Sequence, residues 1–265
     1  MKIGFRMQVL SRSLLLVGAL VLGWGASAAQ AADLARGDPL KEGFTAAGLA
    51  RIDAFFDAEI AANRTPGAVL FVSRNGKIVI RKTYGYLDKA QGLPMKEDAI
   101  FNIASMTKVM TVAGALTLTE EAKLPLGAPV SQWFTDFKDA KLGVVDAQGQ
   151  VSTQPLKRTL TVQDLMRHTN GLTYGARGNT PIHKLFPDSS AGAAIQYTGD
   201  EFIAKLARTP LLYEPGTVWD YGFGIDVLGL LVERVSGKTL DAFLRERVWS
   251  RLGMKDTTFH VPEAQ

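Results

Sequence analysis

The chain of 265 residues contains no cysteine. No disulfide can therefore form, and the fold must be stabilised by a buried apolar core, for which the chain is long enough. It also has little excess charge, a formal +4, part of which lies in its first residues. A charge this small does not favour a nucleic-acid partner.

No apolar run is long enough to cross a bilayer. The longest near the start, Leu14 to Trp24, spans about a dozen residues, whereas a helical span needs about 20. Basic residues precede this run, and Ala29-Gln30-Ala31 fits a small-x-small cleavage site, with cleavage expected after Ala31 and with Ala28 and Ala29 as alternative positions. We expect residues 1–31 to be a removed signal peptide and the mature protein to be exported, periplasmic or secreted, with no stable membrane span. The alternative is an uncleaved anchor.

Several motifs of known chemistry are absent. There is no Gly-x-Ser-x-Gly segment, which argues against an alpha/beta-hydrolase. The three histidines do not have the spacing of metal ligands. Gly237-Lys238-Thr239 is not a phosphate-binding loop, because Val232 stands where that motif needs glycine. No metal or organic cofactor is expected.

The sequence pattern between Thr45 and Ile80 predicts one helix followed by one hairpin. Apolar residues recur on one helical face from Thr45 to Ile60. Ala68–Val72 and Ile78–Ile80 predict two strands, and Asn75-Gly76 between them predicts a tight turn. A two-stranded hairpin is not stable alone in water, so it must pack on helices or on further strands.

Helices are predicted in the rest of the chain. The stretch from Ser105 to Ala122 is apolar around most of its girth, which is typical of a helix buried on all sides. A short helix is predicted between Thr161, as its cap, and Arg167. Two further apolar patterns flank Ser236-Gly237, and residues 171–200 have the composition of a loop.

Ser105 and Lys108 are candidates for catalysis. Residues three apart at the start of a helix share one face, so the hydroxyl and the ammonium group could meet. A serine needs a base to act as a nucleophile, and a lysine is a base only if burial or a nearby cation lowers its pKa. The competing interpretation makes Ser105 a helix cap and Lys108 a solvated charge.

At these residues the chain resembles a known family, the serine beta-lactamases and penicillin-binding proteins. It is most similar to the branch with class C beta-lactamases, related esterases, D-amino-acid peptidases and acyl transferases. The similarity covers most of the predicted mature chain. The matching segments are 75–76, 84–86, 101–111, 165–172, 214–216, 221–223 and 252–257.

The resemblance implies an α/β (α+β) fold, with a mixed antiparallel sheet flanked by helices plus an all-helical region. We expect residues 32–100 to begin the α/β domain and residues 101–265 to form the helical region with the active-site serine. Acyl transfer through Ser105 is implied, with Lys108 and Tyr221 moving protons. Either of these two could accept the proton from the serine. The substrate would be a small ester, amide or lactam.

Two departures from the family pattern affect the expected function. Phe223 replaces an asparagine whose amide could bond to the lysine and to a substrate amide. This favours ester substrates over a class C-like beta-lactamase or D-amino-acid peptidase. The family's third motif and its C-terminal strands would follow residue 265, so we expect a chain that ends there to fold poorly and to turn over little. The rival outside the enzyme class is a non-catalytic exported sensor or binding protein.

Overall fold

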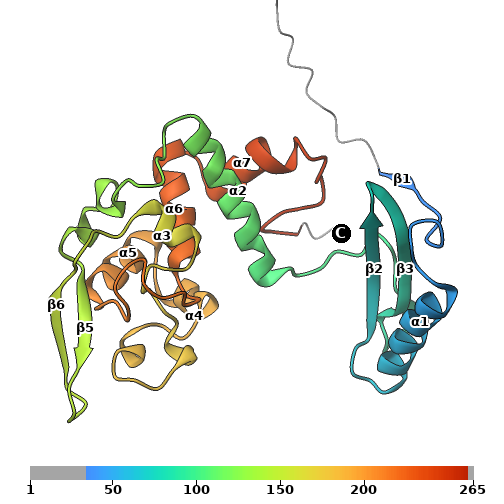
Figure 1. The fold of residues 1–265 in the computed structure, drawn as a ribbon, viewed down its shortest axis with the longest axis horizontal. Helices are drawn as coiled ribbons and strands as arrows, with labels where there is room; N and C mark the ends of the chain where they lie inside the picture. Colours follow the sequence, from blue (N-terminus) through green and yellow to red (C-terminus); the bar gives the residue numbers. More distant parts are fainter. Residues whose placement is uncertain (1–33, 262–265) are drawn as a thin grey trace, which may run out of the picture.

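The computed structural model describes residues 34–261, so the predicted signal peptide, residues 1–31, lies outside the described residues. Figure 1 shows a small sheet with one helix and a larger helical body, with α2 (Thr107–Glu120) between them. This is the expected α/β architecture, a mixed sheet with helices beside a mainly helical region. No helix of this part of the chain is long and apolar enough to cross a membrane.

The sheet contains both strand orientations. Its order is β1-β3-β2, and β4 also pairs with β3. β1 runs parallel to β3, whereas β2 and β4 run antiparallel to it. The elements of this group are β1 (Ala35–Arg36), α1 (Ala46–Ala61), β2 (Gly67–Arg74), β3 (Lys77–Asp88) and β4 (Leu93–Pro94).

The predicted hairpin and its neighbouring helix are confirmed. Asn75 and Gly76 have φ values of 52° and 70°, the two positive values that a type I′ turn needs. The side chain of Thr45 caps α1. α1 packs on β3 through Phe56, whose ring stacks on Tyr84 with centroids 4.5 Å apart.

Helix α6 (Gly224–Ser236) is the centre of the helical body. Val227, Leu228 and Leu231 on it have no exposed surface, and each contributes about 1.5–3 kcal/mol through burial. The helix ends at Gly237, where the sequence predicts a break between two helical patterns, and this glycine has a left-handed φ of 70°. The remaining elements are η1 (Ala104–Met106), η2 (Val130–Gln132), η3 (Thr135–Asp139), β5 (Lys141–Val145), β6 (Val151–Pro155), α3 (Val162–Met166), η4 (Gly175–Arg177), η5 (His183–Leu185), α4 (Ser190–Gln196), α5 (Gly199–Arg208), α7 (Leu240–Leu244) and η6 (Arg245–Trp249).

Helix α2 differs from the prediction of burial on all sides. Its packed side carries Ala115 and Leu118, which are buried against α6 and α7. The opposite side exposes Val109 by 73 % and Leu116 by 42 %. Because apolar residues surround this helix almost evenly, the sequence pattern does not show which side packs.

Four elements of the helical region are not predicted from periodicity. β5 and β6 form a separate two-stranded antiparallel sheet. α4 falls in a stretch predicted as loop, because its small residues carry no apolar period. α5 has a signal that could have located it: Thr198 and Glu201 form a capping box at its start.

Candidate active site

Ser105 lies in a strained turn rather than in a regular helix. It occupies η1, and α2 begins two residues later. The preceding Ala104 has a φ of 43°, a left-handed conformation that costs a non-glycine residue about 1–3 kcal/mol. The Ala104 N–H donates to Asn102 Oδ1 at 3.1 Å, which helps to hold the turn. The turn leaves Ser105 exposed just before the start of α2.

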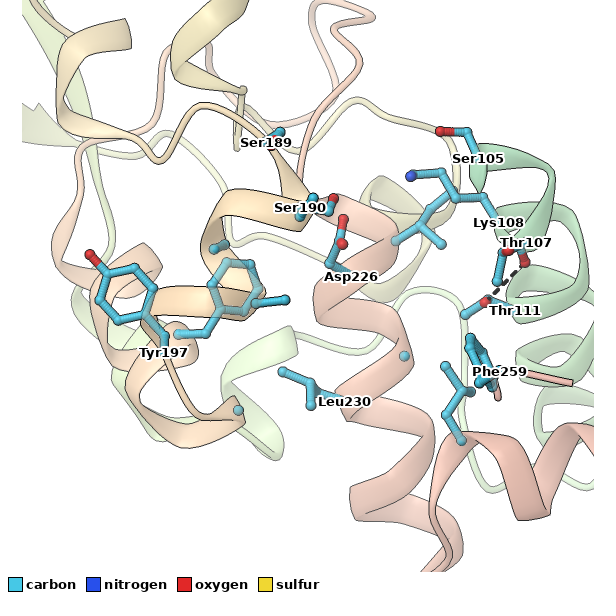
Figure 2. Close-up of a pocket in the computed structure, with 18 of the residues that line it drawn as sticks. Ser105, Thr107, Lys108, Thr111, Ser189, Ser190, Tyr197, Asp226, Leu230 and Phe259 are labelled. Carbon is cyan, nitrogen blue, oxygen red and sulfur yellow. Dashed lines mark hydrogen bonds between the residues drawn. The ribbon is translucent and has the colours of Figure 1, made fainter. Parts of the chain in front are cut away.

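Lys108 lies in the first turn of α2, on the same side as Ser105. Figure 2 shows the two side chains projecting from neighbouring positions toward one space. The lysine is half-buried, and its Nζ lies 5.1 Å from the centre of the Tyr221 ring. The spacing of three residues therefore brings the two groups together, as the sequence predicts.

Tyr221 completes the cluster from a distant part of the chain. Its hydroxyl donates to Ser105 Oγ at 2.6 Å, although the two residues are 116 positions apart. The tyrosine lies in the loop that precedes α6. All three candidate residues thus meet at one point in the fold.

The Tyr221 loop is held by the segment that follows α3. Thr173 and Gly222 form an antiparallel bridge, and the Phe223 N–H donates to the Leu172 carbonyl at 2.8 Å. The two backbone segments, residues 172–173 and 222–223, approach very closely here. A Cβ on Gly222 would lie 2.0 Å from the Leu172 oxygen, so no side chain fits without a backbone shift.

Phe223 does not line the active site. Its side chain is fully buried, with its ring 4.5 Å from that of Tyr174 and 5.2 Å from that of Phe202. From the sequence alone, this position is notable only for the amide that phenylalanine lacks. The structure shows that the phenylalanine is part of the core, because it stands where α6 begins and points into the helical body.

The pKa values of Tyr221 and Lys108 shift in opposite directions. Burial raises the pKa of Tyr221, but the Ser105 hydroxyl, which donates once the phenol is ionised, and the charge of Lys108 stabilise the phenolate more strongly, and the net pKa lies below the usual 10.0. Burial lowers the pKa of Lys108, but Tyr221, Tyr174 and Asp226 stabilise its charge, and the net pKa lies above 10.5. The lysine is therefore held as a cation beside a tyrosine that ionises more easily than usual.

A pocket of about 660 Å³ opens beside Ser105. Figure 2 shows Ser105 and Lys108 at one end, with α4 and α6 forming the walls. The walls are mainly apolar, which suits the organic part of a small molecule. The residues that line the pocket, from these two helices and from neighbouring segments, include Thr111, Tyr174, Ser190, Tyr197, Phe202, Asp226, Leu230 and Phe259.

Asp226 is a pocket residue that the sequence analysis missed. Burial raises its pKa, an effect that the Ser190 hydroxyl and the charge of Lys108 partly oppose. Its Oδ2 is buried and receives no hydrogen bond from the described residues. An acidic residue in the first turn of a helix is common because it suits the helix dipole. The sequence therefore gives no signal that this carboxylate faces the pocket.

The described residues 34–261 contain no group of three or more histidine, aspartate or glutamate side chains that could hold a metal ion. The buried His183 bonds to Thr180 through Nδ1 at 2.7 Å. His168 instead lies against Tyr221, as described below. The groups around Ser105 are hydroxyls, the Lys108 ammonium group, the Asp226 carboxylate and backbone N–H groups.

Comparison with known proteins gives consistent matches. The beta-lactamase family model matches residues 52–265. Protein Rv1367c of Mycobacterium tuberculosis is 38 % identical over 197 residues, which cover 74 % of this chain and 48 % of that protein. Esterase EstB of Burkholderia gladioli is 36 % identical over 230 residues, or 86 % of this chain and 56 % of the esterase.

A solved structure with the same fold is that of EstCE1, described as a hydrolase with promiscuous acyltransferase activity. It superimposes with a TM-score of 0.69 at 27 % identity, covering 82 % of this chain and 54 % of EstCE1. The chain spans about half the length of the curated relatives it matches.

Proposed function

The chain belongs to the beta-lactamase family, and from this premise we propose that it is a serine hydrolase that acts on small esters through an acyl-enzyme at Ser105. The observation that carries the proposal is the hydrogen bond of 2.6 Å between the Tyr221 hydroxyl and Ser105 Oγ, beside the ammonium group of Lys108. A nucleophile in contact with a base, with a third group next to the base, is the arrangement that covalent catalysis needs.

In the proposed reaction, Tyr221 acts as the base and Lys108 stays protonated. The Tyr221 phenolate takes the proton from Ser105 as Oγ attacks the ester carbonyl carbon. The backbone N–H of Ser105, at the start of α2, donates to the oxyanion that forms. Tyr221 then gives the proton to the departing alkoxide, which leaves as an alcohol. The lowered pKa of Tyr221 and the raised pKa of Lys108 support this division of roles.

Water completes the cycle by attacking the acyl-serine, with Tyr221 accepting its proton and returning it to Ser105. An alcohol in place of water would give acyl transfer instead. Ester substrates are favoured, because the buried Phe223 supplies no amide to hold a lactam or a peptide group. A class C-like lactamase or D-amino-acid peptidase would turn over amides at least as well as esters, and a sensor would turn over neither.

Labelling with a fluorophosphonate tests the proposed nucleophile. We expect the intact mass of the exported protein to rise by one adduct, and to stay unchanged in a Ser105→Ala variant, because only an activated serine reacts. The same intact mass also tests the proposed export signal, because cleavage after Ala31 lowers the mass by that of residues 1–31. A folded protein that takes up no adduct would support the sensor, and an adduct that persists in Ser105→Ala would exclude Ser105.

The pH dependence of ester hydrolysis tests the roles of Tyr221 and Lys108. We expect kcat/KM to rise with pH through a pKa below 10.0, as Tyr221 loses its proton, and to fall only above 10.5, as Lys108 loses its own. In Lys108→Met the rising limb should move to higher pH, with a loss of about tenfold or more at pH 7. Replacement of Lys255, which is exposed and does not line the pocket, by methionine is the control. An unchanged limb in Lys108→Met would contradict these roles.

A further inference from the structure

His168 lies directly against the proposed base. It is buried, and its ring lies nearly parallel to that of Tyr221, with centroids 4.6 Å apart and planes inclined by 28°. Trp219 contacts the imidazole edge-on, with centroids 6.1 Å apart. One face of the tyrosine ring is therefore covered by a side chain that takes no part in the chemistry proposed above.

The same residue also holds the backbone on both sides of Tyr221. Its carbonyl accepts a hydrogen bond from the Asp220 N–H at 2.9 Å. Its Nδ1 accepts one from the Gly222 N–H at 3.4 Å. His168 thus contacts the residue before the tyrosine, the tyrosine itself and the residue after it. The two hydrogen bonds hold the backbone on either side of Tyr221, and the stacked ring limits tilting of the phenol.

We propose that His168 is a positioning residue, which fixes the Tyr221 hydroxyl within hydrogen-bond distance of Ser105. This inference rests on the proposed function, because it assigns His168 a role through the proposed base. The role needs Nδ1 as an acceptor, and therefore a neutral ring with its proton on Nε2. A general base must be held within a few tenths of an ångström of its partner, and misplacement by about 1 Å can cost about 100-fold in rate.

The surroundings of His168 favour the neutral ring. The charged groups that face it are Lys108 from α2, Arg177 from η4 and Asp220 from the loop before α6. Burial and the charge of Lys108 lower the pKa of His168, and the opposing effect of Asp220 does not offset them. Protonation of Nδ1 would set an N–H against the Gly222 N–H and release the loop.

The backbone limits which replacements are informative. His168 has a φ of 56°, a left-handed conformation that asparagine tolerates better than most residues. His168→Asn therefore suits the backbone but removes the ring that covers Tyr221. His168→Phe keeps a ring but removes the acceptor for Gly222. The matched control is His183→Asn, which alters a second buried histidine that hydrogen-bonds to Thr180 and not to Tyr221.

The test measures ester hydrolysis and fluorophosphonate labelling on folded protein. We expect both His168 variants to lower kcat by about 10- to 100-fold, with KM changed by less than about twofold. The labelling rate should fall by the same factor, while the final stoichiometry stays at one adduct. The rising limb of the pH profile should move to higher pH, because a misplaced phenol loses the hydrogen bond and the nearby cation that lower its pKa.

A merely structural role would give a different result. It would lower the melting temperature and the fraction of protein that labels, yet leave kcat per labelled site and the pH profile as in the wild type. That result in His168→Asn would overturn the proposal, as would equal losses in His183→Asn. Failure of the proposed function is distinct, since the wild-type protein would then neither label nor hydrolyse esters.

Discussion

Tyr221→Phe is expected to lower kcat for a small ester by about 10²–10⁴-fold, the usual contribution of a general base. The substitution removes only the hydroxyl that contacts Ser105 Oγ at 2.6 Å. The ring stays and still stacks on His168, so the loop should keep its place. KM should change little, because the phenol group takes part in proton transfer in the transition state and does not bind the ester in the ground state. Steady-state kinetics on one ester series measures both constants.

The control for this variant is Tyr197→Phe. It removes a hydroxyl that lines the same pocket but does not hydrogen-bond to Ser105. It should keep near-normal kcat. Tyr221 would not be the base if Tyr221→Phe kept at least about a third of the wild-type kcat while Lys108→Met lost almost all of its kcat. Lysine would then be the proton acceptor, despite the charge-stabilising groups around it.

Asp164→Ala is expected to lower the free energy of unfolding by about 1.5–3 kcal/mol, because it removes a buried carboxylate that accepts several hydrogen bonds, while the Arg158 left behind is 40 % exposed and keeps its contact with water. The Asp164 carboxylate has no exposed surface and accepts from both terminal nitrogens of Arg158, at 2.8 Å and 2.7 Å. It also accepts from the hydroxyls of Thr161 and Thr169, at 2.7 Å and 2.9 Å. Urea unfolding followed by circular dichroism measures the change.

Acid unfolding of the wild type tests the same carboxylate. Burial alone would raise the pKa of Asp164, but the hydrogen bonds from Arg158 and Thr161 outweigh it and hold the pKa well below its usual range. The folded state therefore binds this proton less readily than the unfolded state does. The stabilisation is present above the ordinary aspartate pKa of about 3.9 and is lost as the pH falls below it.

The control for Asp164 is Asp200→Ala, which removes an ion pair whose carboxylate is 91 % exposed. Solvent screens such a pair, so the unfolding midpoint should stay nearly unchanged. Equal midpoints for Asp164→Ala and the wild type, both above and below pH 4, would show that the buried network does not stabilise the fold.

The parts of the fold that follow local rules could be predicted from sequence. Asn75-Gly76 specifies its turn because both residues tolerate positive φ. Thr161 starts α3 through a capping box with Asp164, although the sequence analysis identified only the threonine. Ser105 and Lys108 share a face because they lie about one helical turn apart. These signals span at most a few residues.

The rest of the site depends on contacts between distant residues. No local pattern places Tyr221 against Ser105 over 116 positions, and only the family resemblance suggested it. The choice between Tyr221 and Lys108 as base depends on burial and on neighbours such as Asp226, which periodicity does not locate. The left-handed Ala104 is equally hidden, because alanine normally signals a helix.

The close contact between Gly222 and Leu172 means that residues 168–173 and 219–223 must change together during evolution. Any side chain at position 222 would displace the carbonyl of Leu172 and, with it, the chain back to His168. Substitutions in residues 168–173 and 219–223 should therefore be epistatic, so that a change tolerated in one background fails in another. Recombination between family members would then succeed when both stretches come from one parent, and would fail when they come from two.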